Sequence, residues 1–358
     1  MTGLRRPAPL PSESPRDGSR ATLADVAREA GVSTATASRA LSGRGVCAPA
    51  TRQRVAAVAS LLDFEPSAAG RSLRLQRSHL IGFVVPDISS AFYAGALKGA
   101  QRRLATAGYG VVLMDTDERP EQSLEAVRRL AAQGVDGAIV CSSGESPEAL
   151  RALVQRTRLP VILFDNLVPG VGQGSVTLAN EAGTRLLVDH LEMVHARRRI
   201  AYVGGLVSET SGLERRTGFR LGRAANGLPE VAGYERGGDW TYEAGRTETA
   251  ALIDHPEPPD AIVYAAGLMA LGGLALLRER GVRVPDEVAI VSFDDWEGGG
   301  LLDPPLTALG RRDRQIGDLA ASLLLRIFER EEGGSMELRI PMELVIRRSC
   351  GCVPQRER

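Results

Sequence analysis

The chain has 358 residues, which is more than one domain usually needs, and its 43% hydrophobic and 25% charged residues are ordinary for a folded globular protein. The formal net charge is zero, and no apolar run is long enough to span a membrane. The segment from Met1 to Ala21 is rich in Pro, Ser and Arg and lacks the apolar core of a secretory signal, so we expect a cytoplasmic protein with a disordered tail over residues 1–20.

Positive charge is concentrated at the start of the chain. From Met1 to Arg77 there are 12 Arg against 6 acidic residues, a net charge of +6, which leaves −6 for the remainder. A basic segment joined to an acidic body indicates a polyanionic partner for one end only. The alternative is a solvated basic tail. It is weakened because many of these arginines lie in or beside predicted helices: Arg28, Arg39, Arg44, Arg52, Arg54, Arg71 and Arg74.

A helix is predicted over residues 23–30. Thr22 precedes it and Asp25 follows three residues later, which is the spacing of a capping box. Gly31 then ends the helix in a left-handed conformation. The face that this helix turns inward is small: Val26, Ala27 and Ala30.

A second helix is predicted from a Ser33 cap to about Leu41, and a third from about residue 50 to residue 62. Val32 turns inward between the first two helices, and small residues such as Ala37 allow them to cross closely. The third helix supplies the larger apolar side chains that close this little core: Val55, Val58, Leu61 and Leu62. Two short helices joined by a tight glycine turn predict a helix-turn-helix, whose second helix would enter a DNA major groove.

Residues 78–349 alternate between strand and helix patterns. The apolar runs "LIGFVV", "GVVLM", "GAIVC", "PVILF", "IAYVGG", "AIVYA" and "VAIVSF" predict buried parallel strands. Helical stretches lie between most of them, which predicts an α/β body.

Nothing in the sequence favours an enzyme. The four histidines, His79, His190, His195 and His255, show no nucleophile or ligand spacing. The stretch "GVGQGS" (170–175) leads into a strand-like run and does not open a helix, so we interpret it as a loop and not as a phosphate-binding motif. A secreted solute-binding protein would need an export signal and no DNA-binding head. We expect no catalytic residues.

The cysteines are few: Cys47, Cys141, Cys350 and Cys352. Their spacing gives no disulfide framework, and no Cys/His cluster suggests zinc, so we expect no metal and no cofactor. The Cys-x-Cys pair near the end is either redox-active or, as we favour, incidental.

Motifs along nearly the whole chain resemble the LacI/GalR family of transcriptional regulators. They are "TLADVAREAGVSTATASRALSG", "TRQRVAAVASLLDFEPSAAGRSLR", "IGFVVPDISSAFYAGALKGAQ", "GYGVVLMDTDERPEQ", "GVDGAIV", "RRIAYVGG", "GDWTYEAG", "VPDEVAIVSFDD", "PPLTAL" and "LVIRRSCGC". The resemblance implies an all-α helix-turn-helix DNA-binding head followed by an α/β periplasmic-binding-protein-like body of two parallel-sheet subdomains.

The resemblance also implies domain limits. The head covers residues 21–65, a hinge residues 66–78, and the effector-binding and dimerisation domain residues 79–352, with a tail at 353–358. Three crossovers divide that domain into a first subdomain, about 79–178 and 308–337, and a second, about 179–307 and 338–352.

By resemblance, base edges are read from the start of the second helix, by Thr34, Ala35 and, one turn on, Arg39. An arginine can form a bidentate pair with guanine, and alanine can touch only a thymine methyl. Hydroxyl side chains nearby are candidates for phosphate contacts, with capping and solvation as the alternative: Ser33, Thr36 and Ser38.

The stretch "PSAAGRSLRL" (66–75) resembles the family's hinge, which forms a helix on specific DNA. Leu73 matches the leucine that enters the minor groove, and Arg74 matches a position that can reach it. So short a helix is unstable alone. Gly70 replaces the usual alanine, which costs the helix roughly 0.5–1 kcal/mol and predicts a hinge that folds less readily.

Several effector-pocket positions also match. Phe92 and Tyr93 follow the first strand of the body, and Asp165 and Asp294 end the strands "VILFD" and "VSFD". The two aspartates have an alternative role as loop caps.

Three further pocket positions match: Ser211 and Arg215 in "SGLERRTGF", and Trp240 in "GDW". The arginine position commonly binds the effector, and a lone arginine deep in a cleft needs a partner. The flat tryptophan suits a sugar or a base, or it is packed core.

One departure from the family is clear. Ala266 and Gly267 replace the usual Asn-Asp before "LMALG", and that aspartate binds effector hydroxyls or amines in the family. We therefore expect a roomier, less acidic pocket. Its ligand would be more apolar or anionic than a typical sugar, or there would be none.

These features predict a homodimeric transcriptional regulator, which we expect to be a repressor. It would bind a palindromic double-stranded DNA operator with an affinity set by a small-molecule effector, a sugar or related metabolite, in the cleft. No heptad tail follows "RRSCGC", so dimers are expected, with no membrane partner. The alternatives are a regulator that has lost small-molecule sensing and a solute-binding protein without DNA activity.

Overall fold

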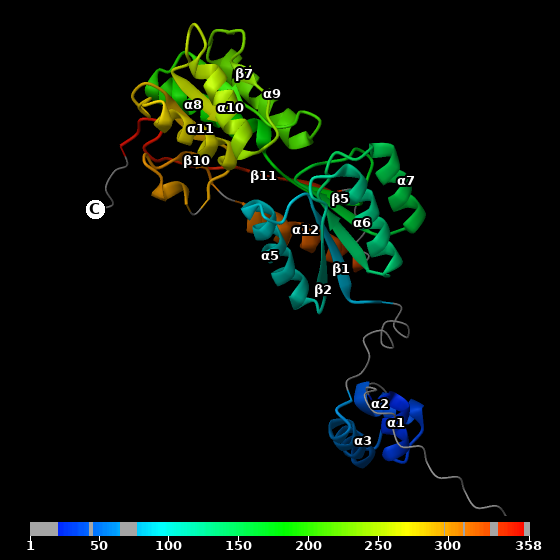
Figure 1. The fold of residues 1–358 in the computed structure, drawn as a ribbon. Helices are drawn as coiled ribbons and strands as arrows, with labels where there is room; N and C mark the ends of the chain where they lie inside the picture. Colours follow the sequence, from blue (N-terminus) through cyan, green and yellow to red (C-terminus); the bar gives the residue numbers. More distant parts are fainter. Residues whose placement is uncertain are drawn as a thin grey trace, which may run out of the picture. The chain divides into compact units, whose positions relative to one another are not determined.

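The computed structural model describes residues 21–42, 46–64, 77–296, 298–310, 312–329 and 336–353. The chain divides into two compact units, with the division between Ser78 and His79 (Figure 1). No helix among these residues is long and apolar enough to cross a membrane.

The first unit is a bundle of three short helices, α1 (Leu23–Glu29), α2 (Thr34–Ser42) and α3 (Pro49–Leu61). The predicted capping box is present: the Asp25 amide donates to Thr22 Oγ1 (3.3 Å) and the Thr22 amide donates to Asp25 Oδ2 (3.0 Å). Gly31 has a φ of +62°, the left-handed conformation that the turn requires. Ser33 Oγ accepts from the Thr36 amide (3.2 Å), so Ser33 caps α2 as predicted.

The core of this unit is built mainly from small side chains. Its buried members are Val26, Ala27, Ala30, Ala37, Ala40, Val55 and Ala59. The prediction that Leu61 closes this core is wrong, since Leu61 is 81% exposed. Because α3 ends at Leu61, the chain turns there. Leu62 packs against the core as predicted, and Phe64 packs against it too. The Arg54 side chain also fastens α3 to the first helix, through Nε donating to the Ala30 carbonyl (3.0 Å).

The second unit contains two six-stranded sheets, each with its own helices. The first sheet has the order β11-β5-β4-β3-β1-β2, and its strand pairs are all parallel. Its strands are β1 (Leu80–Val85), β2 (Gly110–Asp115), β3 (Gly137–Val140), β4 (Val161–Phe164), β5 (Gly174–Leu178) and β11 (Met336–Ile340). Its helices are α5 (Ala91–Thr106), α6 (Pro120–Ala132), α7 (Pro147–Thr157) and α12 (Asp313–Phe328).

Alternate residues of β1 show that helices cover both faces of this sheet. Phe83 belongs to the core beneath α5 and α12, whereas Val84 belongs to the core beneath α6 and α7. Helices α5 and α12 approach closely because Gly99 lies against the Arg314 carbonyl and Gly317 against that of Ala96. A side chain at either glycine would separate the two helices.

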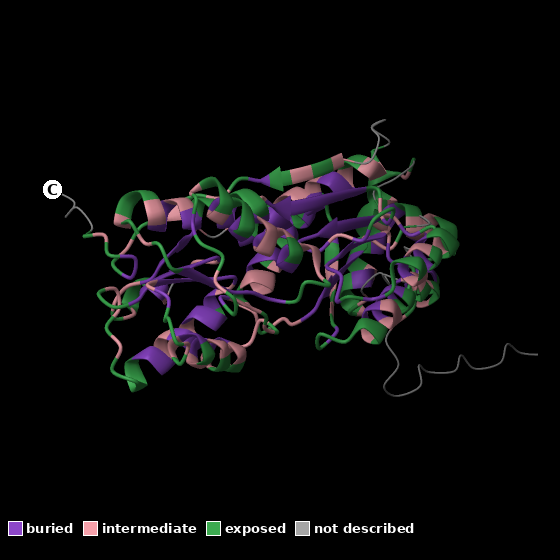
Figure 2. Cartoon of the chain, turned by 90° about the horizontal axis from the view of Figure 1, so that it is seen from above, coloured by how far each residue is buried: buried purple, intermediate pink, exposed green. Residues whose placement is uncertain are grey.

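The second sheet has the order β12-β10-β9-β8-β6-β7, with β12 antiparallel and the others parallel. Its strands are β6 (Ile200–Val203), β7 (Glu235–Arg236), β8 (Ala261–Tyr264), β9 (Ala289–Ser292), β10 (Thr307–Leu309) and β12 (Leu344–Val345). Helix α8 (Asn180–His195) packs on α9 (Thr210–Ala225), and α10 (Tyr242–Ile253) packs on α11 (Gly267–Glu279). A short 3-10 helix, η1 (Gly299–Leu301), precedes β10. Figure 2 shows the strands of both sheets largely buried and the outer helix faces exposed.

The chain crosses between the two subdomains three times, after β5, after β10 and after β11. The last two crossings follow Leu309 and Ile340, within three residues of the expected limits of about 307 and 337. Backbone pairing decides this: β10 pairs with β9 in the second sheet through Ala308, and β11 pairs with β5 in the first sheet as far as Ile340. The carboxyl ends of the parallel strands of both sheets lead into loops that line a shared cleft, where α/β folds commonly bind ligands.

Candidate functional site

The first candidate site is the outward face of α2. Thr34, Ala35 and Arg39 are exposed, whereas Ala37 and Ala40 on the opposite face are buried. In this structure Arg39 lies along its own helix, with Nε donating to the Ala35 carbonyl (3.3 Å). That contact is solvent-exposed, so little is lost when the guanidinium turns toward a base edge.

The hydroxyl side chains predicted for phosphate contacts have roles within the helix. Ser33 and Thr36 share a hydrogen bond between their hydroxyl oxygens (2.9 Å), and Ser33 also caps the helix. Ser38 is half-buried. The capping alternative is therefore observed for Ser33. Leu73 and Arg74, predicted for the hinge, lie outside the described residues.

The second candidate site is a cavity of about 400 Å³ between the two subdomains of the second unit. That volume is within the range of small-molecule pockets. The structure brings all eight predicted pocket residues to its lining: Phe92, Tyr93, Asp165, Ser211, Arg215, Trp240, Gly267 and Asp294.

Contacts between the loop after β4 and the start of α9 join the two subdomains behind this cavity. The Ser211 amide donates to Asn166 Oδ1 (3.1 Å), and Asn166 Nδ2 donates to Glu209 Oε2 (3.3 Å). Thr210 Oγ1 exchanges hydrogen bonds with the backbone of Leu167 (3.1 and 3.2 Å). Glu209 and Ser211, which line the cavity, are thus held by hydrogen bonds with the other subdomain.

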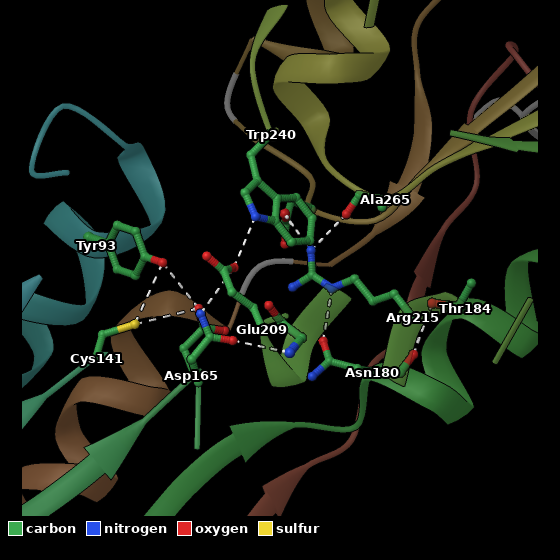
Figure 3. Close-up of polar contacts among 12 residues, drawn as sticks. Tyr93, Cys141, Asp165, Asn180, Thr184, Glu209, Arg215, Trp240 and Ala265 are labelled. Atoms are coloured by element: carbon green, nitrogen blue, oxygen red, sulfur yellow. Dashed lines mark hydrogen bonds and ion pairs between the residues drawn. The ribbon is translucent and has the colours of Figure 1, made fainter. Parts of the chain in front are cut away.

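Arg215 is buried and fixed at the centre of the site (Figure 3). Its Nε donates to Asn180 Oδ1 (2.9 Å), and its Nη1 donates to the Ala265 carbonyl (2.7 Å) and lies 3.4 Å from Asp294 Oδ2. The guanidinium carbon is 3.7 Å from the centre of the Phe293 ring, a cation–π stack. Arg215 is therefore not the unpartnered arginine that we expected. Its Nη2 alone has no hydrogen bond to a described residue, which leaves that nitrogen for a ligand.

Asp165 is a buried carboxylate on the other side of the cavity. Its Oδ2 accepts from the Tyr93 hydroxyl (3.2 Å), and its Oδ1 has no hydrogen-bond partner among the described residues. Burial raises the pKa of Asp165 to about 6; the nearby charge of Arg215 opposes this rise and that of Asp294 adds to it. An unpaired buried oxygen is costly, so it favours a ligand donor at this position.

Glu209, which the sequence analysis missed, links Trp240 to the loop after β4. Its Oε2 accepts from Trp240 Nε1 (2.9 Å) as well as from Asn166 (Figure 3). Burial, followed by the neighbouring charge of Asp165, raises the pKa of Glu209 to about 7. Trp240 is thus held by a hydrogen bond and partly packed, and one side of it still lines the cavity.

Backbone strain is concentrated at this site. Asp165, Trp240, Asp294 and Glu118 all line the cavity, and each has a positive φ, between 46° and 69°. For residues other than glycine this conformation is unfavourable and is retained where the surrounding structure imposes it. Four strained residues thus lie at one cavity, which marks it as a functional site.

The expectation of a roomier pocket is wrong, because Trp296 fills the space at Gly267. A Cβ at Gly267 would lie 2.8 Å from two carbons of the Trp296 ring. The cavity is nevertheless acidic despite the missing aspartate. Six carboxyl side chains line the cavity against two arginines, so an anionic ligand is disfavoured: Asp87, Glu118, Asp165, Glu209, Asp294 and Asp295 against Arg215 and Arg312.

Most of the missed lining residues share one signal that could have found them. Asp87, Glu118 and Trp296 lie in loops just after β1, β2 and β9, at the same ends of the sheets as the predicted residues. Glu209 immediately precedes α9, where acidic residues are common, so its position in the sequence does not mark it as a pocket residue.

A helix-turn-helix unit joined to a two-subdomain α/β unit with a ligand-sized interdomain cavity defines a ligand-responsive DNA-binding regulator. Comparison with protein families supports both halves. Residues 22–67 match the lacI family of bacterial regulatory proteins, and residues 78–348 match the periplasmic binding proteins and sugar binding domain of the LacI family.

Full-length relatives agree with this assignment. The chain is 29% identical to catabolite control protein A of Priestia megaterium over 92% of this chain and 98% of that protein. It is 30% identical to the ribose operon repressor of Escherichia coli K12 over 85% and 92%. The lac repressor dimer bound to operator and the anti-inducer ONPF superposes with a TM-score of 0.84 at 28% identity, covering 93% of this chain and 99% of that one. The chain belongs to the LacI family and is a DNA-binding transcriptional regulator of the repressor type.

Proposed function

We propose that the protein is a homodimeric repressor that binds a near-palindromic operator, and that a neutral polyhydroxylated or cationic ligand in the interdomain cavity sets its affinity for DNA. A sugar or an amine-bearing metabolite fits this description. We also propose that the cavity is a binding site and not an active site, since Asp294 pairs with Arg215 and Glu209 holds Trp240 by a hydrogen bond.

DNA recognition is assigned to the exposed face of α2. Arg39 is the one side chain of the three exposed residues that can make a bidentate contact with guanine, while Thr34 and Ala35 offer methyl contacts to thymine. Dimerisation places two such faces on one duplex, as in the lac repressor dimer bound to operator. Leu73 and Arg74 are proposed to contact the minor groove from the hinge.

The observation that carries the ligand assignment is the pairing of a donor and an acceptor across the cavity. Arg215 Nη2 and Asp165 Oδ1 are both without hydrogen bonds to described residues, and both belong to buried side chains at the lining. A ligand that carries several hydroxyl groups can satisfy both atoms, because a hydroxyl both donates and accepts. Trp240 and Trp296 supply flat apolar surfaces for the carbon face of such a ligand.

Coupling to DNA follows from the position of the cavity between the subdomains. A ligand that binds one relative pose of the subdomains better than another shifts the population toward that pose. If the hinge is ordered to different extents in the two poses, the ligand changes operator affinity. By linkage, the operator changes ligand affinity by the same factor.

A thermal-shift screen of the full chain tests the ligand assignment. The panel comprises neutral sugars, nucleosides, polyamines and, as a contrasting class, sugar phosphates and carboxylic acids. We expect saturable stabilisation by a neutral polyhydroxylated or cationic class, weakened in Asp165→Ala. Stabilisation by the anionic compounds alone contradicts the assignment. Silence across the panel contradicts ligand control and favours a regulator that has lost small-molecule sensing.

A further inference from the structure

Four metal-ligand side chains converge in the second subdomain, away from the effector cavity. His190 and His195 lie on α8, and Cys350 and Cys352 lie in the turn that follows β12. One ligand atom from each of the four lies within 4.8 Å of every other. The expectation that this chain has no Cys/His cluster is therefore wrong, because folding brings together pairs that are far apart in sequence.

We propose that His190, His195, Cys350 and Cys352 form a tetrahedral Zn²⁺ site. Zinc bound by two thiolates and two imidazoles has Zn–S distances of about 2.3 Å and Zn–N distances of about 2.0 Å, which places its ligand atoms roughly 3.3–3.8 Å apart. Cys352 Sγ already lies 3.3 Å from His195 Nε2 and 3.9 Å from His190 Nε2. No pair of the four atoms is more than 4.8 Å apart, so each remaining pair needs to close by at most about 1–1.5 Å to bind one ion.

The two histidines are oriented for a shared ligand. Their rings are 5.2 Å apart between centroids and nearly perpendicular, so both direct Nε2 toward the same sulfur. Zinc binds the lone pair of an imidazole nitrogen, so one ion beside this sulfur can reach both Nε2 atoms.

The sulfur of Cys350 accepts a hydrogen bond from a neighbouring side chain, as metal-bound thiolates commonly do. The Thr307 hydroxyl donates to Cys350 Sγ (3.1 Å), and Thr307 Oγ1 itself accepts from the Arg347 amide (2.8 Å). Because the amide can only donate, the hydroxyl hydrogen is directed at the sulfur. Such second contacts orient metal ligands and stabilise their charge. Without metal, the thiol of Cys350 donates to the Arg347 carbonyl (3.4 Å), and binding would replace that hydrogen bond.

Gly351 allows the Cys-Gly-Cys turn to wrap around His195. It has a φ of +109°, and a Cβ at this position would lie 3.1 Å from His195 Nδ1. Any larger residue would strain the backbone and press on the imidazole. The glycine thus brings the two sulfurs to the same side as the two nitrogens.

The site would fasten the end of the fold to α8. The neighbouring Ser349 hydroxyl donates to the Ile290 carbonyl (2.7 Å) in β9 and accepts from the Thr307 amide (2.8 Å) in β10. Arg347 forms a two-pronged ion pair with Asp295, a residue of the effector cavity (2.7 and 2.8 Å). A metal bound here joins α8 to this network, so it stabilises the second subdomain from its outer side.

Cobalt titration of the reduced, metal-free full chain tests the site. We expect one equivalent of Co²⁺ to produce thiolate-to-cobalt absorption together with the visible bands of tetrahedral coordination, and Zn²⁺ to displace it. Cys352→Ser and His195→Asn are expected to lose these bands, whereas Cys47→Ser, which alters a cysteine outside the cluster, keeps them. Zn²⁺ is expected to raise the melting midpoint of the wild-type chain and not that of the two cluster variants.

Absence of the tetrahedral bands in the reduced wild-type chain overturns the proposal, and this result does not depend on any variant folding. Bands that persist in both cluster variants place the metal elsewhere and overturn it too. If Cys350 and Cys352 form a disulfide, the chain is reduced before titration. A reduced chain that binds neither Co²⁺ nor Zn²⁺ also overturns the proposal. His190→Asn, at the other end of the cluster, provides a third variant if Cys352→Ser fails to fold.

Discussion

Glu209→Gln should stabilise the ligand-free protein at alkaline pH. The pKa of Glu209 rises from 4.5 to about 7 on folding because the carboxyl is buried beside Asp165. The native state therefore binds more protons than the unfolded state between these two values, and stability falls as the pH rises through this window. Glutamine keeps an acceptor oxygen for Trp240 Nε1 and does not ionise, so the variant does not lose stability as the pH rises.

The size of the effect follows from the shift. A difference of 2.5 pH units corresponds to about 3 kcal/mol at full ionisation, and solvent screening of this half-buried side chain reduces it to roughly 1–2 kcal/mol. For a unit of this size each kcal/mol moves the midpoint by about 2–4 °C, so we expect a rise of roughly 2–8 °C at about pH 8 and almost none at about pH 5.

The assay is thermal unfolding of the two full chains across that pH range. Glu337→Gln, which changes an exposed glutamate of β11, is the matched control and should leave the profile unchanged. A difference between Glu209→Gln and wild type that does not vary with pH refutes the reasoning, and so does a variant less stable than wild type at about pH 8.

Three further predictions concern DNA and ligand binding. Arg39→Ala should weaken specific DNA binding by about 1–3 kcal/mol in electrophoretic mobility shifts and relax the sequence preference. The control Arg28→Ala, on the exposed face of α1, should reduce affinity only slightly and to the same extent for all DNA sequences. Equal losses of affinity in the two variants would contradict the assignment of Arg39. Gly70→Ala, outside the described residues, should raise operator affinity by about 0.5–1 kcal/mol per hinge. Unchanged affinity would contradict the prediction that Gly70 makes the hinge helix fold less readily. Both tryptophans, Trp240 and Trp296, line the cavity, so an effector should change intrinsic fluorescence, and a stabilising ligand that leaves the emission spectrum unaltered binds elsewhere.

The fold was largely predictable because its signals are local. The capping box at Thr22, the left-handed Gly31 and the buried apolar strands are each encoded within a few residues. The errors occurred where the outcome depends on distant pairing. Whether Leu61 enters the core depends on where α3 ends, and the shape of the pocket depends on how Trp296 packs against Gly267.

The effector cavity was predictable only in part. Asp165 and Asp294 could be recognised because they closely follow the ends of strands, and parallel strands direct their ends to a common edge. The ring of Trp296 against Gly267, and the raised pKa of Glu209, arise from packing between segments distant in sequence. A missing side chain at one position therefore did not imply an empty pocket.

The Cys/His cluster was missed for the same reason. Spacing rules for zinc search for pairs of ligands near one another along the chain, and here two histidines of α8 meet two cysteines of the C-terminal turn. Only the fold places them together.

Operator affinity of the full chain, measured by fluorescence anisotropy with and without a saturating stabilising ligand, tests the central claim most directly. The DNA is the sequence that the full chain enriches from a random pool. The account predicts an enriched near-palindromic site, binding that weakens steeply with salt, and an affinity that the ligand changes by about fivefold or more. A ligand that saturates the cavity and leaves operator affinity unchanged would contradict it.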